Sequence, residues 1–179
     1  AYALQIKATN EDGSIEGYGS VFGNKDSYND VIQKGAFAES IKSHKSSQTM
    51  PAMLWQHDSS QPIGVWNDIT EDANGLHMRG QLAMGTVKGK EAYELAKMGA
   101  LNGLSIGFVA KGWEYAQGGE VRSLTELELW EVSLVTFPAN TKARITGVKS
   151  TEEIATLKDA ERVLRDSGFS KQDALAFVS

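Results

Sequence analysis

The chain has 179 residues, a length typical of one domain with a core large enough to fold without disulfides. Apolar residues make up 41% and charged residues 23%, and no run approaches the roughly 20 apolar residues of a membrane-spanning helix, so we expect a soluble globular protein. The absence of cysteine excludes disulfides, a thiol nucleophile and thiolate metal sites, and fits a reducing cytosol. A net charge of −5 without a basic cluster argues against nucleic-acid binding.

The first half of the chain predicts mostly β-strands. Apolar residues alternate with smaller or polar ones over residues 2–6 and again over residues 15–22, with an Asp-Gly turn signal between them, which predicts an opening hairpin. Residues 34–45 place Phe37 and Ile41 four apart, as one face of a short helix requires.

The middle of the chain predicts three consecutive strands and a helix. Residues 52–56, 63–69 and 76–82 are short, rich in apolar residues and bounded by turns that contain Pro or Gly. The hydrophobic period then changes over residues 87–98, which predicts a helix that Gly99 ends.

Strand character returns over residues 104–115 and, after a Gly-Gly turn, over residues 124–137. The second of these segments is so apolar that a long, largely buried strand is expected, which Pro138 ends. This order of elements predicts a mainly β domain with inserted helices, and it disfavours a doubly wound α/β sheet because strands and helices do not alternate regularly.

The C-terminal part of the chain has helical character. Residues 151–167 and 170–178 each predict an amphipathic helix, the second with Ser170 as its N-cap. We therefore expect a β-domain over residues 1–148, followed by a C-terminal helical segment over residues 149–179.

Ser105 is the first candidate for a catalytic residue. It lies two residues from Gly103 and two from Gly107, and such glycines let the backbone approach a substrate and adopt torsions that other residues avoid. The pattern matches the G-x-S-x-G nucleophile elbow, but all three histidines precede the serine, and the α/β-hydrolase fold requires the opposite order. Alone, the motif favours a glycine-rich strand in which the serine is merely a small residue at a bulge.

His57 follows an apolar strand at the point where the chain becomes polar, which is a rigid place from which an imidazole can act as a general base. Alternatively, it is a hydrogen-bonded histidine beside Trp55 or a partner of Asp58. We expect His44 to be solvated at a helix end and His77 to lie on the polar face of a strand. The spacing of the His, Asp and Glu residues predicts neither a metal site nor a cofactor.

Glu131 is the candidate for a third member that orients the imidazole, because it directly precedes the most apolar strand of the chain and a buried carboxylate needs a partner. Asp58, adjacent to the histidine, is the alternative. Glu126 and Glu128 are two apart and share a face, so we expect them to be exposed to solvent.

Three motifs in order along the chain, LWQHD, GLSIGF and EVSLVTFPAN, resemble the caudate-phage prohead proteases, which share the fold of the herpesvirus assemblins. The resemblance spans residues 17–144 and includes GYGSVFGN and KGAF. It implies a serine endopeptidase on a closed, mostly antiparallel β-barrel with peripheral helices, in which a histidine, a serine and a third member follow one another along the chain.

Carried over position by position, the resemblance makes His57 the base, Ser105 the nucleophile and Glu131 the third member. In assemblins the third member is itself a histidine, and here no histidine follows the serine, so a carboxylate must take that place. For the oxyanion contacts we expect a backbone N–H of Ala139 or Asn140, and Arg144 is a weaker candidate.

The resemblance also implies a substrate and a place of action. The expected substrates are the N-terminal scaffolding segment of the major capsid protein or a separate scaffold protein, and the protease itself by self-cleavage. The expected location is the immature capsid, the prohead, in the host cytoplasm. The C-terminal segment is then expected to dimerise, to dock on scaffold or to be removed by self-cleavage, and the protein is expected to be a homo-oligomer such as a dimer.

Two other interpretations compete with this one. The same strands and glycines also fit a non-catalytic β-barrel that binds scaffold during capsid assembly. An esterase that uses the serine and the histidine on small acyl substrates is the other alternative.

Overall fold

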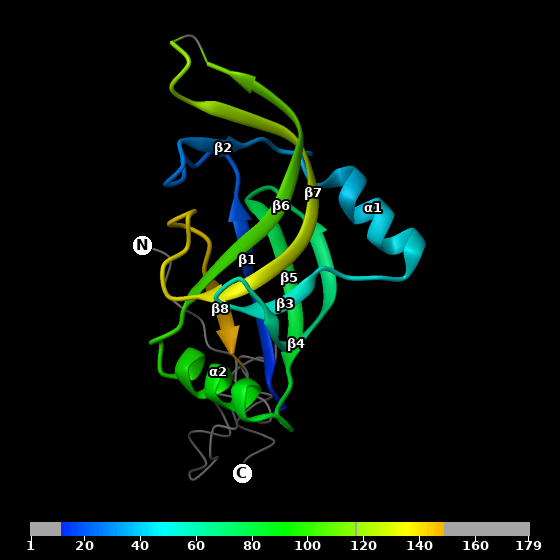
Figure 1. Cartoon of the computed structure of the whole chain (residues 1–179), viewed down its shortest axis with the longest axis vertical. Helices are drawn as coiled ribbons and strands as arrows, with labels where there is room; N and C mark the ends of the chain where they lie inside the picture. Colours follow the sequence, from blue (N-terminus) through cyan, green and yellow to red (C-terminus); the bar gives the residue numbers. More distant parts are fainter. Residues whose placement is uncertain (1–11, 117, 149–179) are drawn as a thin grey trace, which may run out of the picture.

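The computed structural model describes residues 12–116 and 118–148, which form eight strands and two helices (Figure 1). No helix in this described part is both long and apolar enough to cross a membrane. The elements in chain order are β1 (Ser14–Val21), β2 (Asp30–Ile32), α1 (Ala38–Ser47), β3 (Ala52–Trp55), β4 (Asp58–Glu71), β5 (Gly75–Leu82), α2 (Val87–Lys97), β6 (Gly103–Tyr115), β7 (Arg122–Val135) and β8 (Ile145–Val148).

All eight strands belong to one curled, mixed sheet. The strand order is β2-β7-β3-β4-β5-β1-β8, and β6 pairs with β7 along the whole length of that strand. Most neighbours are antiparallel, as expected, but β7 runs parallel to both β2 and β3. The long strand β7 therefore connects the two halves of the sheet, and it lies at the centre of the site described below.

The two ends of the sheet approach each other where β6 meets β8. An isolated antiparallel bridge joins Gly103 to Arg144, and Ile145 donates its N–H to the carbonyl of Asn102. In the described part of the chain this contact is one bridge rather than a ladder of strand pairing, so the sheet is a curled half-barrel. The closed barrel that the resemblance implied is not confirmed.

The core lies inside the curled sheet. Trp66 is 2% exposed, and its indole N–H donates to the carbonyl of Val132 at 3.1 Å. Side chains alternate between the two faces of a strand. Because Leu104 and Val132 point into the core, their chain neighbours Ser105 and Glu131 point to the outer face of the sheet. The candidate catalytic residues therefore stand outside the hydrophobic core, on a rigid support.

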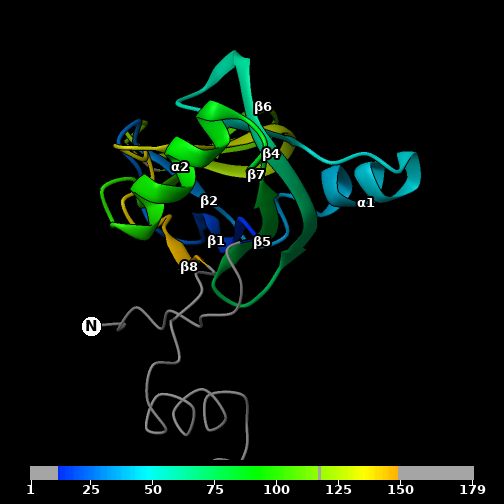
Figure 2. The same ribbon diagram turned by 90° about the horizontal axis from the view of Figure 1, so that it is seen from below.

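The two helices pack on different parts of the sheet: α1 lies beside β7, and α2 lies at one end (Figures 1 and 2). The Ser40 hydroxyl of α1 accepts a hydrogen bond from the Leu129 N–H at 2.9 Å. His44 Nε2 lies 3.0 Å from the Leu129 carbonyl, and His44 Nδ1 lies 3.0 Å from the Thr49 hydroxyl. The expectation that His44 is merely solvated is therefore wrong, because this side chain fastens α1 to β7.

Several sequence predictions of secondary structure are confirmed. The helix expected over residues 87–98 is α2, capped by Thr86, whose hydroxyl accepts from the Gly89 N–H at 3.0 Å. It ends just before Gly99, which has a φ of 76°. The strand expected over residues 63–69 is present but begins earlier, at the start of β4.

Other predictions differ from the structure or lie outside it. The helix expected over residues 34–45 is displaced toward the C-terminus, as α1. The short strands β2 and β8 were not predicted, because three or four residues are too few to show a periodic pattern. The expected strand over residues 2–6 and the two expected C-terminal helices lie outside the described residues.

Candidate active site

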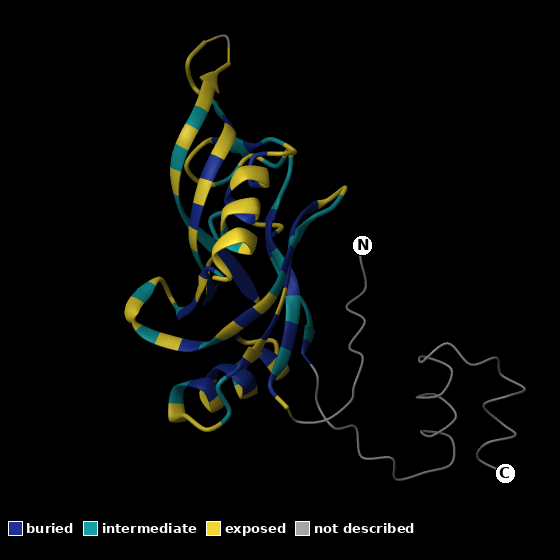
Figure 3. Cartoon of the chain, turned by 90° about the vertical axis from the view of Figure 1, so that its right-hand side faces the viewer, coloured by how far each residue is buried: buried dark blue, intermediate teal, exposed yellow. Residues whose placement is uncertain are grey.

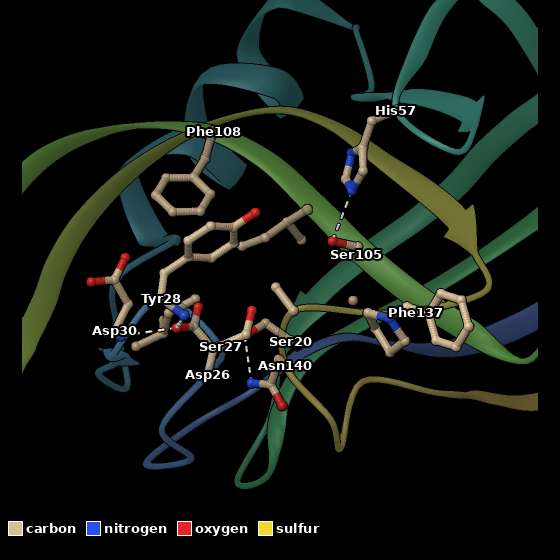
Figure 4. Close-up of a pocket in the computed structure, with 15 residues that line it drawn as sticks. Ser20, Asp26, Ser27, Tyr28, Asp30, His57, Ser105, Phe108, Phe137 and Asn140 are labelled. Carbon is tan, nitrogen blue, oxygen red and sulfur yellow. Dashed lines mark hydrogen bonds between the residues drawn. The ribbon is translucent and has the colours of Figure 1, made fainter.

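Ser105 lies on β6, where its backbone pairs with Ser133 of β7. The residue is 7% exposed, and its hydroxyl oxygen lies 2.9 Å from His57 Nε2 (Figure 4). The structure therefore brings together the serine and the histidine that the sequence singled out, although 47 residues separate them along the chain. A hydroxyl at this distance from an imidazole nitrogen is within reach of direct proton transfer.

His57 reaches this position from a tight turn. Gln56 and His57 are the two residues between β3 and β4, and their φ values are 52° and 62°. This is the left-handed region, which costs a residue other than glycine about 1 kcal/mol, and hairpin turns of this geometry favour Asn-Gly. The turn is held from β7, where the Leu134 carbonyl accepts from the Gln56 N–H at 3.0 Å. Contacts with β7 thus hold the strained backbone of this turn, which fixes the position of the imidazole.

Glu131 lies on β7 and meets the other side of the imidazole, with Oε1 2.5 Å from His57 Nδ1. Its side chain is 12% exposed, against 43% for the histidine. The hydrogen bond that the imidazole donates to Glu131 raises the pKa of His57 above its ordinary value of 6.5, against the opposing effect of partial burial. A carboxylate at Nδ1 places the imidazole proton on that nitrogen, which leaves Nε2 free to accept the proton of Ser105.

Ser133 is a member of this cluster that the sequence analysis missed. It is fully buried, its hydroxyl accepts from the backbone N–H of His57 at 3.1 Å, and it donates to Glu131 Oε2 at 2.6 Å. A serine within an apolar strand carries no signal of such a role. Only the register of β7 against β3 and β6 reveals it, and the sequence does not give that register.

The structure requires glycine on either side of Ser105 for a different reason from the one expected. Neither Gly103 nor Gly107 is among the residues with positive φ, so neither is needed for its torsion. A Cβ at Gly107 would instead overlap Glu131 Oε1 and lie 2.9 Å from Cδ of the same side chain. A Cβ at Gly103 would lie 2.7 Å from Cδ of Pro138. Gly107 therefore provides the space in which the carboxylate meets the histidine.

We expect Gly107→Ala to slow the reaction of Ser105 with a fluorophosphonate probe by about 100-fold while the fold is retained. The added methyl group displaces the flexible end of Glu131, and a shift of about 1 Å in a catalytic group costs on the order of 100-fold. Labelling rates are measured by intact-protein mass spectrometry. Gly112→Ala is the matched control, because its Cβ would also crowd a β7 side chain, Thr125, away from the site. Equal rates in the two variants would contradict this explanation of Gly107.

Asp58 and His77, the other acidic residue and another histidine considered from the sequence, make contacts outside this cluster. Asp58, the other candidate for the third member, accepts hydrogen bonds from the Ser60 N–H and hydroxyl and from the Gln61 amide, which lower its pKa below the ordinary value. His77 stacks edge-on against Tyr18, with ring centroids 5.2 Å apart. In the described part of the chain, no three His, Cys, Asp or Glu residues are grouped so that they could hold a metal ion.

The prediction that Glu126 and Glu128 face solvent is confirmed. Both residues are exposed, and Glu128 forms a surface ion pair with Lys111 at 2.6 Å. Figure 3 shows the alternation of buried and exposed residues along the β6–β7 hairpin from which these side chains project. Of the three glutamates on this strand, Glu131 alone is bonded to other side chains of the site, His57 and Ser133.

An open cleft of about 470 Å³ begins at Ser105 and His57. Figure 4 shows Ser105 between the rings of Tyr28 and Phe108 on one side and the ring of Phe137 on the other. Tyr28 is 77% exposed and Phe137 is 91% exposed, which is unusual for aromatic side chains of this size. The serine therefore opens onto a groove with exposed aromatic side chains on both sides.

The residues expected to supply oxyanion donors also line this cleft. Ala139 and Asn140 form part of its wall, and within the described residues their backbone N–H groups donate to no other group. The Asn140 side chain is engaged, because its amide donates to the Val21 carbonyl at 2.9 Å. Arg144 does not line the cleft, and its guanidinium donates to the carbonyl of the preceding residue.

Comparisons with known proteins give matches in sequence and in fold. A family model described as caudovirus prohead serine protease matches residues 2–159. The prohead protease of Enterobacteria phage HK97 is 36% identical over 181 aligned positions, which cover 98% of this chain and 79% of that protein. A capsid polyprotein of Pseudomonas phage PAJU2 is 39% identical over 103 positions, covering 54% of this chain and 15% of the polyprotein.

Among solved structures, the capsid assembly protease of bacteriophage T4 aligns with a TM-score of 0.55. The two sequences are 13% identical, and the alignment covers 68% of this chain and 82% of the T4 protein. At this level of identity the likeness shows a shared fold.

Proposed function

The chain belongs to the caudovirus prohead serine protease family, and from this premise we propose that it cleaves peptide bonds with Ser105 as nucleophile, His57 as general base and Glu131 as the third member of the triad. Membership in this family makes the protein a serine protease of prohead maturation, and it sets aside the esterase and the non-catalytic barrel. The observation that carries the proposed triad is the continuous chain of contacts from the Ser105 hydroxyl through the imidazole to the Glu131 carboxylate, at 2.9 and 2.5 Å.

In the proposed reaction, His57 Nε2 removes the proton of Ser105 while the serine oxygen attacks the carbonyl carbon of the scissile peptide. Glu131 holds the proton on Nδ1 and stabilises the imidazolium that forms. The imidazolium then gives its proton to the leaving amine, which departs and leaves an acyl-enzyme. Water, activated by the same histidine, hydrolyses the ester and regenerates the serine.

The backbone N–H groups of Ala139 and Asn140 are the proposed donors to the oxyanion. They have no acceptor among the described residues, and they lie in the wall of the cleft that Ser105 faces. Preorganised backbone donors of this kind stabilise the negative charge of the tetrahedral intermediate without any reorganisation. Arg144 stays the weaker candidate, because it does not line the cleft and its guanidinium donates to the Ala143 carbonyl.

The proposed substrate is the capsid protein in its immature form. The similarity to a segment of the PAJU2 capsid polyprotein supports this choice. The cut would fall in the N-terminal scaffolding segment of the capsid protein or in a separate scaffold, and the protease would also cleave itself, inside the prohead. An extended segment of such a chain would bind in the open cleft at Ser105, where exposed aromatic side chains lie on both sides.

The proposed division of the chain places the protease domain in residues 1–148. In this proposal, residues 149–179 serve in dimerisation, in docking on scaffold or in self-removal, and the active form is a homo-oligomer such as a dimer.

The proposed function is tested by covalent labelling. A fluorophosphonate probe is expected to modify Ser105 and no other serine, as peptide mapping by mass spectrometry would show. His57→Ala is expected to reduce the labelling rate by at least about 10³-fold, because the hydroxyl then has no base. Labelling that is directed to another residue, or that proceeds equally fast without His57, would eliminate the proposed mechanism.

A further inference from the structure

Ser133 makes two hydrogen bonds that join separate parts of the site. Its hydroxyl oxygen accepts from the backbone N–H of His57 at 3.1 Å, and its hydroxyl proton goes to Glu131 Oε2 at 2.6 Å. The residue is fully buried and does not line the cleft. It therefore touches the base and the carboxylate of the proposed triad without any access to substrate.

The backbone of His57 needs such a contact. The Gln56–His57 turn is left-handed at both residues, and neither of them is a glycine. Three hydrogen bonds to β7 and the residue after it hold Gln56. Its backbone N–H donates to the Leu134 carbonyl, its side-chain amide donates to the Thr136 hydroxyl at 2.8 Å, and its amide oxygen accepts from the Thr136 N–H at 3.3 Å. A fourth hydrogen bond, to the Ser133 hydroxyl, holds the backbone of His57 itself. A strained turn keeps one conformation only where its surroundings enforce it.

The carboxylate of Glu131 needs the same contact for another reason. One oxygen faces His57 Nδ1, and the other accepts the proton of Ser133. A serine hydroxyl has a single proton, so its direction is fixed once that proton is donated to Glu131, and its lone pairs then face the His57 N–H. The Ser133 hydroxyl thus fixes the position of the His57 backbone relative to the Glu131 carboxylate.

We propose that Ser133 is a positioning residue of the protease, which aligns the imidazole of His57 for Ser105 by fixing the histidine backbone and the Glu131 carboxylate together. This inference rests on the proposed triad and deepens it. Ser133 acts through its two neighbours, and its removal should slow the chemical step while substrate or probe still binds in the cleft.

The test compares Ser133→Ala with the wild-type protein in fluorophosphonate inactivation. We expect the maximal inactivation rate, kinact, to fall about 100-fold, and the probe concentration for half-maximal rate, KI, to stay within about twofold, because small displacements of a catalytic group cost about this much. Ser40→Ala is the matched control, since Ser40 is also a buried serine whose hydroxyl accepts from a backbone N–H, that of Leu129 in β7. The control should keep the wild-type kinact. A wild-type kinact in a folded Ser133→Ala protein would overturn the inference.

Coupling to Glu131 separates positioning from a general loss of structure. If Ser133 acts largely through the carboxylate, Ser133→Ala should cost less than about 10-fold when Glu131→Gln is already present, whereas independent effects multiply. A full 100-fold cost in both backgrounds would overturn the inference. Should Ser133→Ala fail to fold, Ser133→Cys replaces it, because a thiol fills the same space and hydrogen-bonds only weakly. At least a tenfold loss of kinact is expected there, and a wild-type rate would count against the role.

The proposed triad can fail separately from this inference. If Ser105 is not the residue that the probe modifies, the triad fails whatever Ser133 does. If Ser105 is modified at a rate that depends on His57, and Ser133→Ala leaves that rate unchanged, the triad stands and the role of Ser133 is lost.

Discussion

Ser105→Ala is expected to abolish cleavage of the capsid protein, with a loss of roughly 10⁵-fold or more in turnover, while the fold remains intact. Removal of a nucleophile from a triad has an effect of this size because no other group forms the acyl-enzyme. The hydroxyl makes one described hydrogen bond, to His57, and no hydrophobic contact of the core depends on its oxygen. A loss of about 1 kcal/mol of stability is therefore the most that we expect, which lowers the thermal midpoint by only a few degrees.

The measurement is co-expression with the capsid protein, followed by mass spectrometry of the capsid chain. Uncleaved capsid protein together with a normal melting curve is the expected result for Ser105→Ala. Ser40→Ala is again the matched control, because both serines are 7% exposed and each makes a single described side-chain hydrogen bond. Processing of the capsid chain at the wild-type rate by Ser105→Ala would show that another residue is the nucleophile.

The residues brought together at this site could be predicted where their chemistry conflicted with their surroundings. Glu131 stands out because a carboxylate next to a run of apolar residues needs a partner. Ser105 stands out through its glycines, although neither is needed for its torsion, and Gly107 instead leaves space for Glu131. In both cases the residue departs from what a regular strand would carry at that position, and such departures are expected at functional residues.

The geometry of the base could not be predicted in the same way. The turn at Gln56 and His57 lacks the Asn-Gly that a two-residue hairpin usually carries, because contacts with β7 rather than local preference impose its left-handed backbone. Ser133 is invisible for a related reason: a serine has no distinctive signal until strand register places it beside Ser105 and Glu131. The parallel pairing of β3 with β7 is likewise a long-range contact that leaves no local pattern.

Glu131→Gln is expected to lower turnover roughly 10³-fold without unfolding the protein. The amide fills the space of the carboxylate, but it is neutral and cannot stabilise the imidazolium that forms when His57 takes the proton of Ser105. The amide can also present its NH2 group to Nδ1, which would draw the imidazole proton to Nε2, where it blocks the base. Glu126→Gln is the control, since it makes the same chemical change at an exposed position of the same strand.

The pH dependence gives a second readout of Glu131→Gln that misfolding cannot imitate. Catalysis requires neutral His57, so the rate rises with pH through the pKa of that residue. In the wild-type protein the hydrogen bond from His57 to the Glu131 carboxylate raises this pKa, so the midpoint of the rise lies above the ordinary value of 6.5. Without the negative charge the pKa falls back, and the midpoint should move to lower pH although the maximal rate is much smaller. A midpoint that stays in place while the rate falls would mean that Glu131 does not act on the imidazole.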